Sequence, residues 1–355
     1  MKVKAPKQLI ESILVNLQPF LERKDATQIT SHIFFHATHD ECLIKATDNE
    51  IGLQIKTDQI LVESEGTFTA NGKKLLDIIR ILKEGDITLE LIQDNLLIMQ
   101  QHSKFKLPTF DPALFPAFPE VDNKAQITLN SYDLIRHLKK ISPAIDTNNP
   151  KHELNGALIN IKEESTDLVG TDTRRLAVAS IPSTQSEPLQ LIVPKKAILE
   201  IQKLFLDEIA MHYDETNLII TNANYFFFTR LINGKFPDYE RIIPQHLKYT
   251  VELPKKAMLD AIKMITTISY DIKMTLHDSF IVFNSLSSDN VEAKTEIAIN
   301  TGLSEKMEIS FSSRYMLDFL AQVEGESFTL GMNEPTLPFM IKENDFMTII
   351  MPIVV

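Results

Sequence analysis

Cysteine, glycine and long apolar runs are all scarce in this chain of 355 residues. Cys42 is the only cysteine, which excludes an internal disulfide and a cysteine-based zinc site and fits a reducing cytoplasm. No stretch of about 18 unbroken apolar residues occurs, so the sequence predicts no membrane span. Glycine occurs only 10 times, which disfavours the glycine-rich loops that cradle nucleotides.

Motifs for catalysis are also missing. The segment GTFTANGKK (66–74) only partly resembles a phosphate-binding loop, because Lys74 stands where that loop requires Ser or Thr. His36 and His39 lie in a predicted strand and do not form a metal motif, and neither GxSxG nor HExxH occurs. We therefore predict no catalytic activity, no metal and no cofactor. An enzyme whose active site is assembled from distant residues remains an alternative.

The chain also lacks an excess of positive charge. Its formal net charge is −12, which taken alone argues against nucleic acid as a partner. The charge is unevenly placed, however. The segments 73–83, 131–145, 194–205 and 254–269 together carry +9, which leaves −21 for the rest of the chain.

All four basic segments have the pattern of helices. If these helices line one surface, that surface attracts phosphate loosely and non-specifically, while the acidic remainder repels DNA elsewhere. Lysines on any one amphipathic helix are also compatible with an ordinary solvated face. A scaffold that binds only protein is therefore a further alternative.

A unit of about 120 residues is repeated three times. Three amphipathic segments have apolar residues at i, i+4 and i+7, the spacing of one helical face, and successive segments are offset by 124 residues. These apolar residues are Ile10, Leu14 and Leu17, then Leu134, Leu138 and Ile141, and then Met258, Ile262 and Ile265. A second helix follows in each unit, at Leu76-Asp77, Leu199-Glu200 and Leu317-Asp318.

Strand-like segments surround the second helix of each unit, and proline-rich connectors lie near residues 115 and 240. The order of elements predicts an α+β fold with mostly antiparallel sheet, two helices packed on it in each domain. The predicted domains are 1–122, 123–246 and 247–355. The repeat alone leaves open whether the domains curve into a closed assembly.

Several segments resemble one known family. LNGALINI (154–161), DLVGTDTRRLAVAS (167–180) and RLINGKFPDYERIIP (230–244) look like the central domain of the bacterial DNA polymerase III β subunit, the sliding clamp. FKLPTFDPALFPAFPEV is similar to the end of that family's first domain, and NGKKLLDIIRIL to its second helix. The C-terminal MPIVV resembles the family's terminal Met-Pro segment. The resemblance runs the length of the chain.

The resemblance implies a homodimer in which two three-domain chains close head to tail into a ring of six clamp domains. Such a ring encircles double-stranded DNA without sequence preference and acts as a processivity factor. Short linear motifs of the polymerase III catalytic subunit, the clamp loader, other polymerases and repair proteins then dock in a hydrophobic pocket. A cytoplasmic, non-catalytic accessory subunit with no membrane contact is expected.

The resemblance also implies which residues form the partner-peptide pocket. They are Leu154, Thr171, Thr173, Arg174, Arg175, Leu176, Pro244, Tyr315, Thr336, Pro338, Ile349, Met351, Pro352, Ile353, Val354 and Val355. Two departures touch this pocket, because Thr173 replaces the family's usual glycine and the chain ends in Val354-Val355 rather than a basic residue and leucine. Leu154, Leu176 and Ile349 are equally compatible with plain core packing.

Two further groups of residues complete the expected sites. Arg23 and Lys24 match a basic loop of the family that faces the DNA. The segregation of charge adds to the DNA-facing set Lys73, Lys74, Arg80, Lys83, Arg136, Lys139, Lys140, Lys195, Lys196 and Lys203. At the dimer interface the resemblance implies Phe105, Leu107 and Ile268, with Ser269 where a larger apolar residue is usual.

Overall fold

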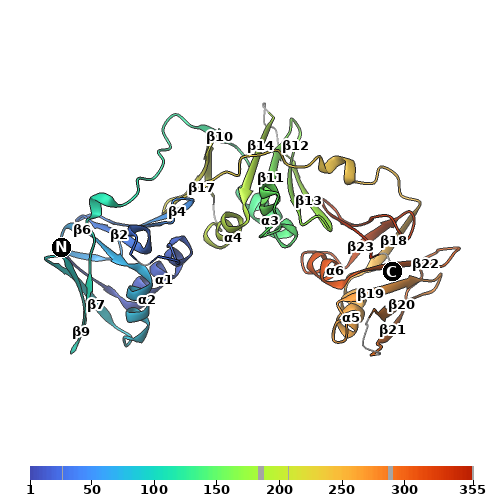
Figure 1. The fold of residues 1–355 in the computed structure, drawn as a ribbon, viewed down its shortest axis with the longest axis horizontal. Coiled ribbons are helices and arrows are strands. Elements are labelled where there is room, and N and C mark those ends of the chain that lie inside the picture. The colour runs from blue at the N-terminus through green and yellow to red at the C-terminus, as the bar shows by residue number, and fades with distance from the viewer. Residues whose placement is uncertain (26, 183–187, 207, 287–290, 354–355) are drawn as a thin grey trace. The chain divides into compact units, whose positions relative to one another are not determined.

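A computed structural model describes residues 1–25, 27–182, 188–206, 208–286 and 291–353 (Figure 1). The fold is α+β, as the order of predicted elements indicated. The α-helices of the described residues are α1 (Lys7–Leu17), α2 (Gly72–Ile81), α3 (Ser131–Ile141), α4 (Lys195–Leu204), α5 (Lys255–Thr266) and α6 (Ser313–Leu320). Short 3-10 helices are η1 (Gln18–Phe20), η2 (Ile29–Ser31), η3 (Pro112–Leu114), η4 (Ser142–Ala144), η5 (His152–Asn155) and η6 (Tyr239–Ile242).

The helices bury the apolar faces that the sequence predicted. The buried residues on α1, α3 and α5 include Ile10, Leu14, Leu17, Leu134, Leu138, Ile141, Met258, Ile262 and Ile265. At the start of α2, the Asn71 side chain accepts a hydrogen bond from the Lys74 amide (3.0 Å), which satisfies one of the free donors of the first turn. In the part of the chain that is described, no helix is long and apolar enough to cross a membrane.

Every strand pairs antiparallel with its neighbours. The five-stranded sheet runs in the order β5 (Leu61–Ser64), β1 (Lys2–Pro6), β7 (Asp86–Ile92), β8 (Asn95–Gln100) and β9 (Ser103–Pro108). A first eight-stranded sheet runs β10 (Ala125–Ile127), β15 (Ala210–Tyr213), β16 (Asn217–Thr221), β17 (Tyr225–Arg230), β4 (Ile51–Thr57), β3 (Cys42–Thr47), β2 (His32–Ala37) and β6 (Gly66–Asn71).

The other two sheets belong to the C-terminal part of the chain. The second eight-stranded sheet runs β14 (Leu189–Pro194), β11 (Gly156–Ile161), β12 (Ser165–Thr171), β13 (Arg175–Pro182), β25 (Phe346–Ile350), β24 (Phe339–Glu343), β23 (Ser327–Met332) and β18 (Tyr249–Pro254). The four-stranded sheet runs β21 (Lys294–Ala298), β20 (Phe280–Ser285), β19 (Asp271–Leu276) and β22 (Met307–Ser312).

The chain divides into two compact units. The first comprises Met1–Ser131 with Lys203–Leu231, and the second comprises Tyr132–Gln202 with Ile232–Val355. Each unit contains one eight-stranded sheet, and the middle repeat contributes four strands to each of these sheets. The middle repeat is therefore divided between the units because its two half-sheets pair with different neighbours.

Each eight-stranded sheet is two four-stranded half-sheets joined at a central strand pair, which we call a seam. In the first seam β17 pairs with β4, with Phe228 opposite Gly52. In the second seam β13 pairs with β25, with Leu176 opposite Ile349. At the two seams, the inner edge strands of four half-sheets find hydrogen-bond partners for their main-chain groups.

The first seam is packed with aromatic rings. Phe227 makes edge-to-face contacts with Phe20 and Phe205, and Phe118 packs against Phe228 at 4.9 Å between ring centroids. A Cβ atom added to Gly52 would lie 2.2 Å from the Phe228 ring. Glycine is needed at this position because the ring lies directly against the backbone of β4.

We expect Gly52→Val to lower the free energy of unfolding by about 1–3 kcal/mol, because the new side chain displaces Phe228 from the seam. Urea unfolding followed by circular dichroism measures this change. Lys56→Val on the exposed part of the same strand is the matched control and should change the free energy by less than about 1 kcal/mol. An unchanged midpoint for Gly52→Val would show that Phe228 does not pack over this position.

Candidate functional site

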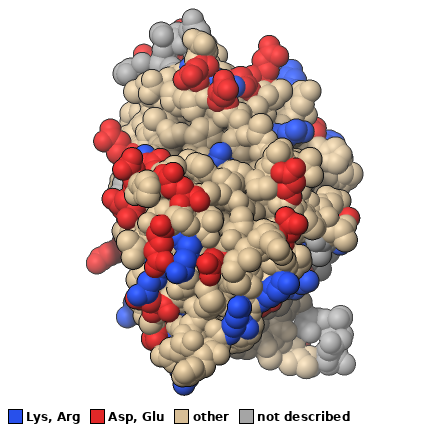
Figure 2. All heavy atoms as spheres, turned by 90° about the vertical axis from the view of Figure 1, so that its left-hand side faces the viewer, with Lys and Arg blue, Asp and Glu red and all other residues tan. Residues whose placement is uncertain are grey.

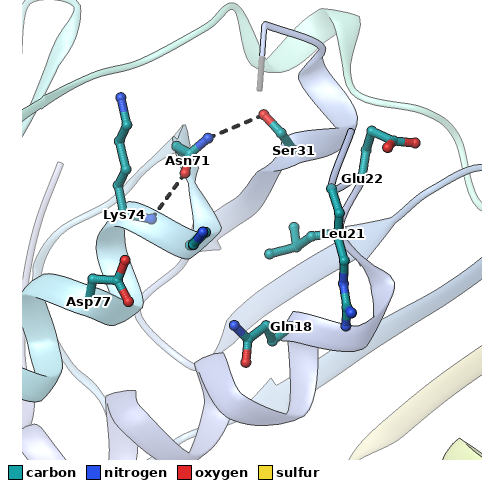
Figure 3. Close-up of a pocket in the computed structure, with 9 residues that line it drawn as sticks. Gln18, Leu21, Glu22, Ser31, Asn71, Lys74 and Asp77 are labelled. Atoms are coloured by element: carbon teal, nitrogen blue, oxygen red, sulfur yellow. Dashed lines mark hydrogen bonds between the residues drawn. The ribbon is translucent and has the colours of Figure 1, made fainter. Parts of the chain in front are cut away.

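A basic cavity of about 710 Å³ lies in the first unit, between the end of α1 and the start of α2 (Figure 3). Its lining residues are Gln18, Leu21, Glu22, Arg23, Ser31, Asn71, Lys73, Lys74 and Asp77. Asn71 links the two walls, because its side chain caps α2 and donates to the Ser31 hydroxyl (3.3 Å). The cavity therefore has a hydrogen-bonded frame with exposed cationic side chains around it.

Three cations at this cavity are available to an anion. Arg23, Lys73 and Lys74 are exposed, and none of them forms an ion pair with any residue that the structure describes. His32 adds no charge, because burial, together with the charge of Lys74, lowers its pKa to about 4. The arrangement fits loose binding of phosphate, with Asp77 and Glu22 limiting its strength.

The other residues predicted to face DNA divide into two groups. Exposed side chains are found at Lys24, Arg80, Lys83, Lys139, Lys196 and Lys203. Of these, Arg80 also lies 3.8 Å from a carboxylate oxygen of Glu11. In the second group, Arg136 is paired with Glu324, and Lys195 donates to the carbonyl oxygen of Ile145. Burial lowers the pKa of Lys195, and its amine is directed at this carbonyl oxygen.

The prediction that Lys140 faces DNA is wrong. This residue is only 4% exposed, and its ammonium lies 3.4 Å from Asp345 Oδ1 and 3.8 Å from Glu324 Oε1. A buried ammonium requires nearby carboxylates, and those available here come from a distant part of the sequence. Lys140 therefore stabilises the second unit and is not free to bind a ligand.

Polar groups hold the second seam together next to Lys140. The ring nitrogens of His137 contact the Asp133 carbonyl oxygen (2.6 Å) and Asp345 Oδ2 (2.7 Å). Burial acts to raise the pKa of Asp345, but the hydrogen bond from His137 and the charges of His137 and Lys140 outweigh it and keep the pKa low. Helix α3 is thereby tied to the β24–β25 turn.

On the face drawn in Figure 2, acidic side chains spread over much of the surface, and Lys and Arg gather mainly toward its lower end. Charges of the two signs are therefore unevenly distributed on this face.

The predicted peptide pocket falls in the second unit, where its apolar members form a core. Leu154, Leu176 and Ile349 are at most 2% exposed and pack with Met340, among other residues. Their role in the described structure is core packing, the alternative that the sequence left open. These three side chains are closed off from solvent in the described structure.

More accessible residues surround this core. Thr173, Arg174, Thr336 and Met351 are exposed, Met351 by 40%. Pro244, Tyr315, Pro338, Pro352 and Ile353 are partly exposed, and Thr171 is buried. Val354 and Val355 lie outside the described residues. The amide of Met351 donates to the Arg174 carbonyl oxygen (2.9 Å), which fastens the C-terminal segment to the turn that carries Thr173.

Arg175 anchors this turn from below. Its side chain is 3% exposed, and its guanidinium donates to Asp172 (3.0 Å), to Asp318 on α6 (2.6 Å) and to the Pro143 carbonyl oxygen. It also lies over the Tyr315 ring at 4.6 Å from the centroid. Burial, with the charge of Asp172, raises the pKa of Tyr315. Arg175 therefore positions the turn and does not reach solvent.

A buried polar network fastens the connector that contains η6. The Tyr239 hydroxyl donates to Asp167 (2.6 Å) and accepts from the Asn160 amide (2.9 Å), while Ser180 and Lys162 also donate to Asp167. Burial raises the pKa of Tyr239 to about 12, and the hydrogen bond to Asp167 acts in the same direction. Burial also acts to raise the pKa of Asp167, but its three donors keep the pKa below the usual value.

The residues predicted for the dimer interface lie in both units. Phe105 is half-buried and Leu107 is buried, both on the edge strand β9 of the five-stranded sheet. Ile268 is 42% exposed after the end of α5. The Ser269 hydroxyl donates to the Leu286 carbonyl oxygen (2.8 Å), which explains a polar residue at this position.

Several of these residues were not predicted from the sequence. Asp318, Glu324, Asp345 and His137 have no motif and meet their partners only through the fold. Tyr239 lies in the segment FPDYERIIP, where a tyrosine beside charged residues in a connector was the available signal.

Thr173 has a φ of +72°, in the left-handed region that β-branched residues rarely adopt. We expect Thr173→Gly to raise the free energy of unfolding by about 0.5–1 kcal/mol, because relief of strain exceeds the added chain entropy. Thr250→Gly in β18 is the control and should lower it by a similar amount. Urea unfolding compares the two, and destabilisation by both changes would contradict strain at Thr173.

Tyr239→Phe should lower the free energy of unfolding by about 1–3 kcal/mol, because Asp167 loses a buried donor. The pKa of Asp167 is lowered in the folded protein, so its contribution is complete above the unfolded pKa and is lost as pH falls through the folded value. The deficit should thus be steady between about pH 5 and 8 and shrink below about pH 4.

Urea unfolding at pH 3.5 and 7 measures the deficit for Tyr239→Phe. Tyr132→Phe, at a tyrosine that is 70% exposed, is the control and should show little change at either pH. An equal deficit for Tyr239→Phe at both pH values would mean that Asp167 does not depend on the tyrosine hydroxyl.

Family models match nearly the whole chain. The DNA polymerase III beta subunit N-terminal domain matches residues 1–119, its central domain matches 128–238, and its C-terminal domain matches 240–354. The beta sliding clamp of Helicobacter pylori strain J99 is 38% identical over 353 residues, covering 97% of this chain and 94% of that protein. The beta sliding clamp of Staphylococcus aureus is 26% identical and covers 88% of each chain.

Solved structures have the same fold. The crystal structure of the H. pylori beta clamp bound to a DNA ligase peptide has a TM-score of 0.93 at 37% identity and covers 100% of both chains. The DNA polymerase III subunit beta of Pseudomonas aeruginosa has a TM-score of 0.91 at 22% identity, again covering 100% of both, and supports the fold alone. With three domain models in order along its length, the chain belongs to the DNA polymerase III beta subunit family, the bacterial beta sliding clamps.

Proposed function

We propose that two copies of this chain close head to tail into a ring around duplex DNA and hold replication and repair proteins there. The chain is a beta sliding clamp, a non-catalytic accessory subunit of DNA polymerase III. We propose domains at 1–122, 123–246 and 247–355, a ring of six such domains, and action in the cytoplasm beside the chromosome.

The repeated seam is the observation that carries the proposal. Each repeat contains a hairpin with a two-residue loop, formed by β16–β17, β24–β25 and β8–β9. The second strands of these hairpins, β17, β25 and β9, are therefore equivalent in the three repeats. β17 and β25 are joined to β4 and β13, whereas β9 has a free edge among the described strands. The strand equivalent to β4 and β13 is β21, which also has a free edge. A second copy of the chain satisfies both.

The two existing seams also predict the register of the third. Three residues, Asn71, Pro194 and Ser312, each directly precede the second helix of their repeat and so occupy equivalent positions. When the cross-strand pairing is followed from each of them across its half-sheet, it leads to Gly52, Leu176 and Glu292, which are therefore also equivalent. Since Gly52 faces Phe228 and Leu176 faces Ile349, Glu292 should face the equivalent residue of β9, Lys106.

This register favours pairing. The opposed Lys106 and Glu292 have opposite charges, and Leu107 meets Val291, which is 48% exposed in the single chain. Cross-strand pairs of these kinds stabilise a sheet by about 0.2–1 kcal/mol each. Phe105, Ile268 and Ser269 remain proposed members of this interface.

DNA contact in this proposal is weak and electrostatic. Arg23 and Lys24 with the exposed helix lysines attract phosphate, and the cavity at the start of α2 provides a place where a backbone phosphate can rest. Few fixed contacts and no base readout let the ring move along the duplex. Closure around DNA then supplies the retention that affinity does not.

Partner proteins are proposed to dock on the second unit. The H. pylori relative was solved with a DNA ligase peptide. In this chain the exposed Thr173, Arg174 and Met351 surround an apolar core, which suits an aliphatic or aromatic peptide anchor. The polymerase III catalytic subunit, the clamp loader, other polymerases and repair proteins are the proposed owners of such peptides.

The test is retention of the loaded protein on nicked circular DNA before and after the circle is cut. We expect retention on the circle and loss within minutes on the linear form, because a ring slides off free ends. Raising the salt from 0.05 to 0.3 M should leave the circular complex largely intact, since closure and not charge retains it. Equal retention on both forms would instead indicate surface binding and contradict the ring.

A further inference from the structure

The second seam is fastened by a charged pair between the middle of α3 and the segment that follows α6. Arg136 on α3 pairs with Glu324, which follows α6, through two hydrogen bonds, one of them 2.6 Å long. Lys140, one turn later on α3, reaches the same carboxylate at 3.8 Å. Helix α3 and the end of α6 therefore carry opposite charges where the half-sheets join.

Hydrogen bonds donated by main-chain amides show which residue of the first repeat corresponds to Glu324. The main-chain amide of Glu324 donates to the side chain of Glu343, and the main-chain amide of Lys83 donates to the side chain of Gln100. Glu343 and Gln100 occupy equivalent positions, because they are the last residues of β24 and β8 before the hairpin turn. The amides of Lys255 and Lys7 likewise donate to the carbonyl oxygens of Glu326 and Gly85, two residues further on. Lys83 thus occupies the place of Glu324.

The repeat of helix faces gives the residue that corresponds to Arg136. Leu134, Leu138 and Ile141 are buried on α3 just as Met258, Ile262 and Ile265 are on α5, 124 residues later. Asp260 therefore occupies the place of Arg136, and it is exposed with no ion pair among the described residues. Both charges are reversed relative to the second seam.

We propose that Asp260 of one copy pairs with Lys83 of the other across the interface that closes the ring. This inference rests on the head-to-tail dimer proposed above and names a contact within it. Lys83, which the segregation of charge placed facing DNA, belongs to the interface in this proposal.

Neighbouring positions fit the same assignment. Met264 replaces Lys140 and is 61% exposed, and Ala261 replaces the buried His137. On the facing side, His102 replaces Asp345 in the β8–β9 turn. At the closing interface, the cluster of His137, Lys140 and their carboxylates is thus replaced by the single Asp260–Lys83 pair.

The reversal also means that the two seams and the interface between copies differ in the charges at these positions. At the first seam the corresponding residues are Ser12 and Leu206, which are uncharged. Pairing α5 with the end of α6 would oppose Asp260 and Glu324, and pairing α3 with the end of α2 would oppose Arg136 and Lys83. Like charges at both wrong pairings disfavour exchange of half-sheets between copies.

Charge reversal tests the contact. Lys83→Glu and Asp260→Lys should each weaken the dimer roughly tenfold in sedimentation equilibrium at 0.05 M salt, and less at 0.5 M salt. The double variant Lys83→Glu/Asp260→Lys restores the pair with its polarity exchanged and should return to within about threefold of the natural protein. Lys256→Glu is the control on α5, since its equivalent Tyr132 is 70% exposed and outside the second seam.

The possible results of this experiment distinguish failure of the Asp260–Lys83 contact from failure of the proposed ring. Single variants that dimerise normally, or a double variant no better than the single ones, would overturn the Asp260–Lys83 pair while leaving a dimer in place. A natural protein that stays monomeric at every concentration would overturn the proposed ring and this contact together.

Discussion

Antiparallel pairing between half-sheets is the constraint on which the rest of the structure depends. A four-stranded half-sheet leaves a row of amide and carbonyl groups on its inner edge, and those groups need partners. The chain meets this need twice, where β17 joins β4 and where β13 joins β25. The middle repeat contributes one half-sheet to each join and is for that reason divided between the two compact units.

Since the backbone bonds are alike at both seams, side chains must distinguish them. The first seam is closed by phenylalanine rings over Gly52, where no other residue fits. The second is closed by Arg136, His137 and Lys140 against carboxylates, with Arg175 buried beneath the turn that carries Thr173. Charged side chains with several partners tolerate fewer alternative arrangements than apolar ones, so this network also fixes the position of the turn.

The sequence correctly predicted features that depend on local pattern, such as the buried face of a helix. It did not predict features that depend on residues distant in the sequence, such as the partners of a charged side chain. Apolar spacing predicted the buried faces of α1, α3 and α5, because a helix places i, i+4 and i+7 on one side whatever it packs against. It predicted Lys140 as exposed, because nothing near it in sequence shows that Asp345 lies beside it. The resemblance identified the turn at Thr173, but only the backbone shows that a threonine there adopts a left-handed conformation.

In the proposed ring, weak attraction of DNA and long retention on it are compatible only if different parts of the molecule supply them. A net charge of −12 limits how strongly the surface can bind phosphate, and the cations at the start of α2 are balanced in part by Asp77 and Glu22. Stronger phosphate contacts would slow sliding without improving retention on a closed circle. Retention in the proposed ring must then come from the interfaces between half-sheets, and above all from the one between copies that has to open to release DNA. Substitutions at the strand pair proposed to close the ring should therefore affect clamp lifetime on DNA more than substitutions of the exposed lysines.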